Sequence, residues 1–314
     1  SAHDPAFVGP MNILITGVNG FIGRALWDHF KVQRSSPDVF GIDLQISHPE
    51  PRLLTCDLGD QRQLVKVLDR ARPDVIFHLA GGRPADDNML WQVNFIPTKT
   101  LFDVVADLKG VSPCVVIPGS AAEYGQVKMP RRPVAETLQP QPLGWYGFVK
   151  YMQTSLGLMY ARKGLDVRIA RIFNIGGYGT PSILALGSFA RRIVQIERGK
   201  EPRVLKVGQL SGQRDFVDIE DVCSALWAIA RKGKRGEVYN VCSGRSSRMR
   251  SLLRELIRYS DIKDSVVIQE EQRAHASTFD IVGSNAKIKR AIGWRPRVSL
   301  EQSLKNTLRY YREL

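Results

Sequence analysis

The stretch Met11–Gly23, MNILITGVNGFIG, decides the fold. It begins with a short unbroken apolar run, Ile13–Ile15, which is typical of a strand buried on both faces of a sheet. Gly17, Gly20 and Gly23 follow at GxxGxxG spacing, and a helical pattern then resumes. We expect a strand, a tight turn that lets a diphosphate approach the backbone, and a helix whose N-terminus receives its negative charge. An ordinary glycine-rich loop is the alternative.

The composition is that of a globular protein. A chain of 314 residues with 43% hydrophobic side chains can bury a large core, in one large domain or two of ordinary size. A spanning helix is not expected, because no run of roughly 18 apolar residues is present. Residues 1–10 lack the charged, apolar and small-residue regions of a secretory leader. We expect them to be a tag or disordered leader, because a natural start at Met11 would place the first strand at the extreme N-terminus.

The cysteines and the charge distribution restrict the setting. Four cysteines lie far apart without CxxC spacing or a nearby histidine cluster, so we expect neither metal ligation nor a disulfide framework, and a reducing cytoplasm is the simplest location. Residues 1–150 carry 15 basic and 15 acidic side chains, whereas residues 151–314 carry 30 and 16. This excess could attract a phosphorylated small substrate, nucleic acid or an acidic membrane surface, or it could be a solvated surface.

A second strand, DVFGID at Asp38–Asp43, ends in an acid about 20 residues after the glycines, the position at which a carboxylate holds a ribose diol. Asp43 therefore favours NAD(H), because a 2′-phosphate would meet the carboxylate unfavourably and Leu44 and Gln45 offer no guanidinium. Arg24 keeps NADP(H) open. The alternative for Asp43 is an ordinary turn residue.

Further strands alternate with helical segments, which predicts an α/β fold with a doubly wound parallel sheet. The expected strands are Leu53–Asp57, Val75–Ala80 and Cys114–Ile117, and a helix is expected around Trp91–Val105. In such sheets ligands lie beyond the carboxyl ends of the strands. The residues that follow an expected strand should therefore line one crevice: Gly17, Asp43, Asp57, Gly81 and Ser120.

Tyr146 and Lys150 stand four residues apart in the expected helix YGFVKYMQTSLGLMYARKG, so they share a face. An unperturbed tyrosine has a pKa of about 10. A fixed cation nearby lowers this pKa, so the phenol can take part in acid-base chemistry near neutral pH. Lys150 can supply the cation and also bind a ribose hydroxyl. Such a pair alone usually lies on the exposed surface of a helix. Together with the glycine turn, Asp43 and Ser120, it indicates a candidate active site.

On these motifs the sequence resembles the extended short-chain dehydrogenase/reductase family of the NAD-dependent epimerase/dehydratase type, which acts on nucleotide-diphosphate sugars. The resemblance covers nearly the whole chain from Met11. It rests on GVNGFIG, Asp43, Asp57-Leu58, HLAG, GSAAEYG, YGFVK, RIFN, GQRDFVDIEDV and GEVYNVCSG. Within the family the second half is most similar to the GDP-4-dehydro-6-deoxymannose reductases, through LKVGQLSGQRDFVDIEDV and GEVYNVCSGRSSRMRSLL.

The resemblance implies a Rossmann-type cofactor domain over residues 11–174 and 214–242, and a smaller C-terminal substrate-binding domain over residues 175–213 and 243–314. Tyr146 would be the acid-base residue, Lys150 its partner and Ser120 the hydroxyl that orients the reacting oxygen. The substrate would meet Ser120, Asn174, Arg214 and Arg273, although a structural role suits Arg273 equally. The implied cofactor contacts are Gly17, Gly20, Phe21, Ile22, Gly23, Asp43, Asp57, Leu58, Leu79, Ala80, Gly81, Tyr146 and Lys150.

Departures from the family pattern narrow the activity. Dehydratases carry an acid and a base where this chain has Ala121 and Ala122, and Glu123 is one residue out of register. FNIGGYG lacks the histidine that mannose-type reductases place after the asparagine, which leaves the sugar and the base open. Pro97 replaces an expected glycine, a change we interpret as structural.

We therefore expect a reductase that passes hydride from NAD(P)H to the 4-keto group of a nucleotide-linked 6-deoxyhexose. A 4-epimerase with tightly bound NAD is the nearest alternative, because it uses the same three residues. A non-catalytic NAD(P)-sensing or RNA-binding protein is more remote, since Ser120, Tyr146 and Lys150 are intact. The family usually forms homodimers through two helices, one of which would contain Tyr146. No metal, membrane or nucleic-acid partner is expected.

Overall fold

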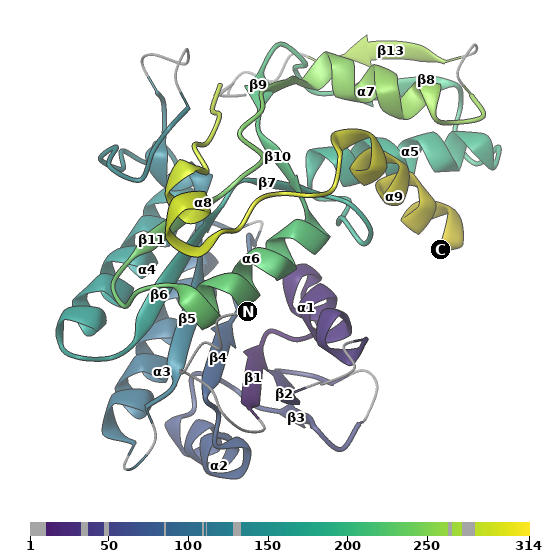
Figure 1. Ribbon diagram of the computed structural model, residues 1–314. Helices are drawn as coiled ribbons and strands as arrows, with labels where there is room; N and C mark the ends of the chain where they lie inside the picture. Colours follow the sequence, from purple (N-terminus) through teal and green to yellow (C-terminus); the bar gives the residue numbers. More distant parts are fainter. Residues whose placement is uncertain are drawn as a thin grey trace.

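The predicted doubly wound α/β sheet is confirmed. The computed structural model describes residues 11–32, 37–46, 50–84, 86–108, 110, 112–127, 133–262, 266–271 and 280–314. Seven strands form one parallel sheet in the order β11-β6-β5-β4-β1-β2-β3 (Figure 1). The strands are β1 (Asn12–Thr16), β2 (Asp38–Asp43), β3 (Leu53–Thr55), β4 (Val75–His78), β5 (Cys114–Ser120), β6 (Val167–Ile172) and β11 (Val238–Val241).

Three strands end at other residues than expected. β2 has the expected limits, but β3 ends at Thr55 and β4 at His78. β5 continues to Ser120, past the expected Ile117, because β6 pairs with it along its whole length and matches Ser120 with Ile172. Ser120 is thus the last residue of a strand rather than part of the following loop.

Helices cover both faces of the sheet (Figure 1). Side chains of α1 (Phe21–Lys31), α6 (Ile219–Lys232) and α8 (Ala286–Ile292) pack on one face. Those of α2 (Gln61–Ala71), α3 (Ile96–Asp107) and α4 (Trp145–Arg162) pack on the other. The residues of β1 alternate between these cores, as a strand buried on both faces requires.

A separate hydrophobic core joins the remaining helices, drawn at the upper right of Figure 1. It is built by α5 (Ala185–Glu197), α7 (Met249–Arg258), α9 (Leu300–Glu313) and the pair β8 (Val204–Val207) and β13 (Val267–Glu270). Two further pairs are β7 (Asn174–Gly176) with β10 (Phe216–Asp218), and β9 (Gln213–Arg214) with β12 (Ser247–Arg248). No helix among the described residues is long and apolar enough to cross a membrane.

Asp215, between β9 and β10, links these pairs to the large sheet. Its fully buried carboxylate accepts hydrogen bonds from the Ser243 backbone and hydroxyl at 2.8 and 2.6 Å. The amides of Gly244 and Gly283 donate to it at 2.9 and 3.1 Å. Four donors satisfy a charge that would otherwise be costly to bury.

The glycine turn after β1 is as tight as its spacing predicts. Gly17 has φ +68°, and a Cβ there would lie 2.7 Å from Cα of Ala80. A Cβ on Gly23 would lie 2.0 Å from the carbonyl oxygen of Gly17. Helix α1 therefore packs directly on the turn, and a side chain at either glycine would separate them.

Gly23→Ala should lower the free energy of unfolding by about 1–3 kcal/mol, because the added methyl group overpacks a rigid backbone contact. Chemical denaturation measures the change. Gly208→Ala is the matched control, since nothing lies within 4 Å of a Cβ at Gly208. Equal stability of the two variants would contradict the packing described here.

Candidate active site

Predicted cofactor and catalytic residues lie along the carboxyl edge of the sheet. β1 lies between β2 and β4, and β5 follows β4, so the glycine turn, Asp43, Ala80 and Ser120 lie at neighbouring strand ends. The Asn19 amide donates to Asp43 Oδ2 at 2.9 Å, which fixes the turn against β2. Gly17 packs against Ala80 on the other side.

The start of α1 fits the diphosphate of a dinucleotide. Gly20 is the N-cap residue and makes no side-chain capping bond, and the first turn of α1 contains no acidic residue. Phe21 and Ile22 open the helix and are half-buried. The first-turn amides are thus left without a side-chain acceptor at the positive end of the helix dipole, which is the arrangement an anion requires.

Asp43 is held in place by the backbone. Its Oδ2 accepts the Asn19 amide and its Oδ1 accepts the Leu44 amide, both at 2.9 Å. Each carboxylate oxygen keeps a second lone pair, so a ribose diol can still donate to it. Arg24 on α1 pairs with Asp28 at 3.4 Å.

The remaining residues expected to bind the cofactor differ in burial and in the groups that they present to a ligand. Asp57 Oδ1 accepts the Gly59 amide at 2.8 Å. Leu58 is buried in the core beneath the sheet, so a ligand at this position would meet its backbone rather than its side chain. Gly81 has φ +137°, and a Cβ there would lie 2.6 Å from Oδ1 of Asn94. Leu79 packs against the core that contains α1.

Ser120 is fixed by its own capping motif. It is the N-cap of η2, a 3₁₀ helix at Ala121–Tyr124, and its Oγ accepts the Ala122 amide at 3.2 Å. Its own amide donates to Glu123 Oε1 at 2.7 Å, which completes a capping box.

Glu123 is fully buried, and both oxygens of its carboxylate accept hydrogen bonds from neighbouring residues. Arg171 on β6 donates to Oε2 from Nε and Nη2 at 3.0 and 2.8 Å, and the Thr154 hydroxyl donates to Oε1 at 3.1 Å. Burial raises the pKa of Glu123, and the Arg171 charge opposes this. The carboxylate that stood one residue out of register for a dehydratase therefore points into the protein.

Tyr146 stands at the start of α4, half-buried. Burial raises the pKa of its phenol, while a hydrogen bond with Ser120 and the charge of Arg83 lower it. The Arg83 guanidinium lies 5.3 Å from the centroid of the Tyr146 ring. Lys150 was expected to lower this pKa, but the net change is a rise, and the influences that oppose it come from Ser120 and Arg83. Like an ordinary tyrosine, Tyr146 is therefore protonated at neutral pH, the state that a proton donor needs. Sequence reasoning missed Arg83, whose signal is a cation two residues after Gly81.

Lys150 lies one helical turn after Tyr146 and is buried. Burial lowers its pKa to about 8, and the Glu123 carboxylate opposes this change. Its Nζ donates to Oε1 of Gln153. Gln153 was also missed, although its i+3 spacing from Lys150 on the same helix was visible in the sequence.

The expected substrate residues come from the smaller strand pairs. Asn174 opens β7, and its Nδ2 donates to the Asp215 carbonyl oxygen at 2.9 Å. Arg214 on β9 is half-buried; burial and the nearby charge of Arg83 lower its pKa, and Asp280 opposes this. Arg83 and Arg214 are thus close enough to repel each other electrostatically. Arg273 lies outside the described residues.

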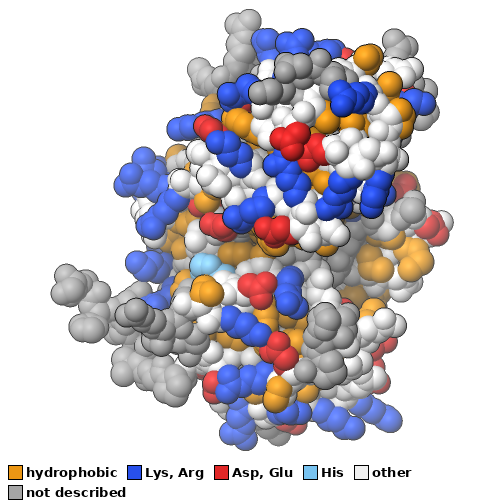
Figure 2. All heavy atoms as spheres, turned by 90° about the vertical axis from the view of Figure 1, so that its right-hand side faces the viewer, with side chains coloured by type: hydrophobic (Ala, Val, Ile, Leu, Met, Phe, Trp, Pro, Cys, Tyr) orange, Lys and Arg blue, Asp and Glu red, His pale blue; other side chains and the backbone are white. Residues whose placement is uncertain are grey.

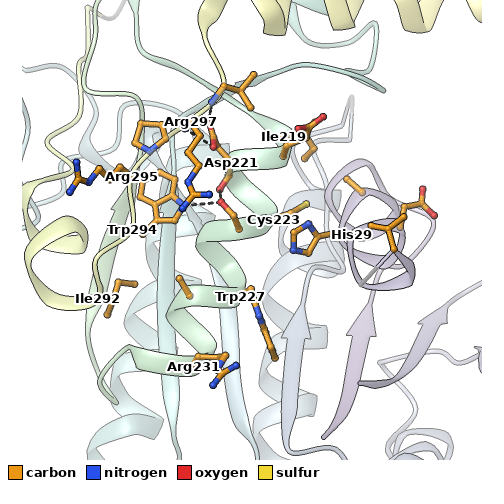
Figure 3. A pocket seen from close by; sticks show the side chains of 18 of the residues that line it. His29, Ile219, Asp221, Cys223, Trp227, Arg231, Ile292, Trp294, Arg295 and Arg297 are labelled. Atoms are coloured by element: carbon orange, nitrogen blue, oxygen red, sulfur yellow. Dashed lines mark hydrogen bonds between the residues drawn. The ribbon is translucent and has the colours of Figure 1, made fainter. Parts of the chain in front are cut away.

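A large surface groove of about 1400 Å³ lies away from this site, between α1, α6 and the segment before α9. Figure 3 shows Trp227, Arg231, Trp294 and Arg297 around it. None of the predicted catalytic or cofactor residues lines the groove. The Asp221 carboxylate, which lines the groove, accepts hydrogen bonds from the backbone amides of Arg297 and Val298, at 2.8 and 2.9 Å.

In the described part of the chain, no group of three or more His, Cys, Asp or Glu residues could hold a metal ion.

Comparison with known proteins identifies the family. The profile of the NAD dependent epimerase/dehydratase family matches residues 13–242, which is well over half of the chain. The chain belongs to this family. The resemblance inferred from the motifs is therefore confirmed, and the protein is an NAD(P)-dependent oxidoreductase of the extended short-chain dehydrogenase/reductase type.

Individual relatives cover almost the whole chain. GDP-6-deoxy-D-mannose reductase of Pseudomonas aeruginosa is 30% identical over 94% of this chain and 95% of its own length. UDP-glucose 4-epimerase of Mycolicibacterium smegmatis is 26% identical over 96% and 99%. The solved structure of RMD from Pseudomonas aeruginosa with NADPH superposes with a TM-score of 0.84, at 29% identity, over 96% of this chain and 99% of that one.

Arg171→Leu should reduce the free energy of unfolding by about 3–5 kcal/mol, because it leaves the Glu123 carboxylate buried without its partner. The folded pKa of Glu123 then rises further above its unfolded value, so the folded state binds the extra proton. The loss should be largest at alkaline pH and shrink as the pH falls through the folded pKa. Urea denaturation across the range from about pH 5 to pH 8 measures it.

Lys305→Met is the control, because its partner Glu301 and Lys305 itself are half-exposed and such pairs contribute about 0–1 kcal/mol. A pH-independent loss in Arg171→Leu would show that Glu123 is not the group responsible.

Proposed function

We propose that the protein reduces the 4-keto group of a nucleotide-diphosphate 4-keto-6-deoxyhexose similar to GDP-4-dehydro-6-deoxymannose. The observation that supports the proposal is the hydrogen bond between Tyr146 and Ser120 at the carboxyl end of β5, with Lys150 buried one helical turn after Tyr146. The GDP-6-deoxy-D-mannose reductase relative and the similar motifs in the second half support this substrate class.

When bound, NAD(P)H would supply the hydride. Ser120, fixed by its capping box, would hold the substrate's carbonyl oxygen. Tyr146 would donate its phenolic proton to that oxygen as negative charge develops on it, which lowers the barrier. The Lys150 ammonium would stabilise the resulting phenolate and bind a ribose hydroxyl.

The large sheet and its helices would form the cofactor domain, and the separate core around α5, α7 and α9 the substrate domain.

Arg214 and Asn174 are the proposed contacts for the anionic part of the substrate. A guanidinium binds two phosphate oxygens at once, and Arg214 is half-buried beside a second cation, Arg83. The face turned to the viewer in Figure 2 carries Lys and Arg side chains over most of its height. Such a surface would also draw an anionic substrate toward the protein.

A 4-epimerase is the second candidate, because a UDP-glucose 4-epimerase is also similar over 96% of this chain. An epimerase oxidises and then reduces the same carbon, so it keeps its NAD and consumes none. Purified protein that retains NAD and interconverts two nucleotide sugars without added cofactor would replace the reductase proposal.

We further propose a cytoplasmic homodimer. The four cysteines are free and buried, in keeping with a reducing compartment. Apolar side chains stay exposed at the start of α4 and beside it, at Trp145, Phe148 and Trp91, and Trp91 stacks on Phe95 at 3.9 Å. A second copy could cover this surface.

The direct test is to mix the protein with GDP-4-dehydro-6-deoxymannose and NADH or NADPH and follow the nicotinamide absorbance. Tyr146→Phe should lower kcat by about 10²- to 10⁴-fold, because the proton donor is lost. If the wild-type protein oxidises neither cofactor, Tyr146→Phe loses nothing measurable and the protein binds nucleic acid in a salt-dependent way, a non-catalytic role replaces this proposal.

Asp43 should set the cofactor preference, and we propose that NAD(H) is favoured. Asp43→Asn should lower kcat/KM with NADH and raise it with NADPH, changing their ratio by about tenfold or more, since the carboxylate no longer repels a 2′-phosphate. Asp38→Asn is the control: it removes a carboxylate from the other end of β2, where Asp38 pairs with Arg52. An unchanged ratio in Asp43→Asn would contradict the assignment.

A further inference from the structure

A chain of buried polar side chains runs from Lys150 through the protein to the glycine turn. Lys150 Nζ donates to Gln153 Oε1, and Gln153 Nε2 donates to Thr98 Oγ1 at 2.6 Å. His78 Nε2 lies 2.9 Å from the same Thr98 oxygen, and His78 Nδ1 lies 2.9 Å from Thr16 Oγ1. We call Gln153, Thr98, His78 and Thr16 the polar chain; each is 0–1% exposed.

The direction of every hydrogen bond in the polar chain follows from Thr98. Its hydroxyl donates to the Asn94 carbonyl oxygen at 2.7 Å, an acceptor that cannot donate in return. Having one proton, Thr98 must then accept from both other neighbours. Gln153 therefore presents its NH₂ group to Thr98, and His78 presents Nε2–H.

The far end of the polar chain gives the same polarity. The Ala80 amide donates to Thr16 Oγ1 at 3.1 Å, so the Thr16 proton is free to go to His78 Nδ1 at 2.9 Å. His78 is then neutral, with its proton on Nε2. Burial and the Lys150 charge lower its pKa to about 3, in agreement with this state.

This polarity decides what Lys150 meets. With its NH₂ group held by Thr98, Gln153 has its carbonyl oxygen directed at Nζ. A carbonyl acceptor stabilises an ammonium group more than a neutral amine, and the effect is strong at low local dielectric. The charged groups that face Lys150 from neighbouring elements are Glu123 on η2, which pairs with Arg171, and His78 at the end of β4, which is uncharged.

We propose that the polar chain holds the Gln153 carbonyl oxygen against Lys150 and thereby keeps Lys150 an ammonium at neutral pH. Gln153, Thr98 and His78 are positioning residues, because they act through Lys150. The inference rests on the proposed function insofar as Lys150 is its cation. Burial favours the uncharged amine, and the Gln153 carbonyl oxygen opposes this effect together with the Glu123 carboxylate.

The first experiment measures the pKa of Lys150 without substrate or cofactor. Protein labelled with ¹³C-lysine is titrated by NMR, and Lys150→Met identifies the resonance. Gln153→Met should lower the pKa of Lys150 by about one unit, the size expected when a buried charge loses a hydrogen bond. Gln153→Glu should raise the pKa, because it places a carboxylate at the same point. Shifts in the same direction, or no shift, would overturn the proposal.

The second experiment tests the more distant part of the polar chain. Thr98→Val does not touch Lys150 but frees the Gln153 amide to turn, so it should also lower the pKa of Lys150. Thr98→Ser keeps the hydroxyl and should restore the wild-type value. Thr307→Val is the matched control, since it removes a buried hydroxyl that bonds Gly177 in another part of the protein. A Thr98→Val titration equal to wild type would remove Thr98 and His78 from the proposal.

The third readout is kcat/KM against pH. Its alkaline limb should move to lower pH in Gln153→Met and Thr98→Val and to higher pH in Gln153→Glu, whereas loss of packing alone would lower activity at every pH. The NMR titrations need no turnover, so they remain decisive even if another substrate replaces the proposed one. Opposite movements of the limb and of the titrated Lys150 pKa would overturn the coupling between them.

Discussion

The buried ion pair between Glu123 and Arg171 is the interaction on which the site depends. It joins β6, η2 and α4, because the Glu123 carboxylate also accepts the Ser120 amide and the Thr154 hydroxyl. Ser120 and the helix that carries Tyr146 and Lys150 are thereby held by one carboxylate. An ion pair at this depth is retained only when hydrogen bonds satisfy both charges, and such a network fixes geometry more than it adds stability.

Much of the fold could be predicted because its signals are local. The apolar run at Ile13–Ile15, the glycine spacing and the acid at Asp43 indicate burial, a turn and a strand end without reference to distant residues. Strand ends could not be predicted as well, since β5 reaches Ser120 through pairing with β6, about fifty residues later in the chain. Pro97, interpreted as structural, follows a π-helix at Trp91–Phe95 in which the Ile96 amide bonds the Trp91 carbonyl; proline has no amide to continue the ordinary register.

The candidate site likewise contains residues that the sequence predicts and partners that only the structure reveals. Tyr146, Lys150 and Ser120 could be proposed from spacing and strand position, whereas the partners that tune them come from other elements. Arg83 reaches Tyr146 from the loop after β4, and Thr98 reaches Gln153 from α3. Neither contact produces a periodic pattern in the sequence, because the two residues lie far apart along the chain. The role of Glu123 was equally hidden, because only the packing of β6 beside η2 shows that its carboxylate points inward.

The supply of titratable groups limits the chemistry that the family scaffold can perform here. Removing water from a sugar requires a base that takes a proton from one carbon and an acid that protonates the hydroxyl group leaving the next. Ala121 and Ala122 provide neither, and Glu123 is held by Arg171. In the proposed role, Tyr146 would exchange a single proton with the oxygen on the reacting carbon, which suits reduction or epimerisation. Both reactions use the same phenol, as the proton donor in reduction and, in its deprotonated form, as the base in oxidation. A polar chain that keeps Lys150 charged is compatible with both states of Tyr146, so the difference between the two reactions is whether the oxidised cofactor is released or retained.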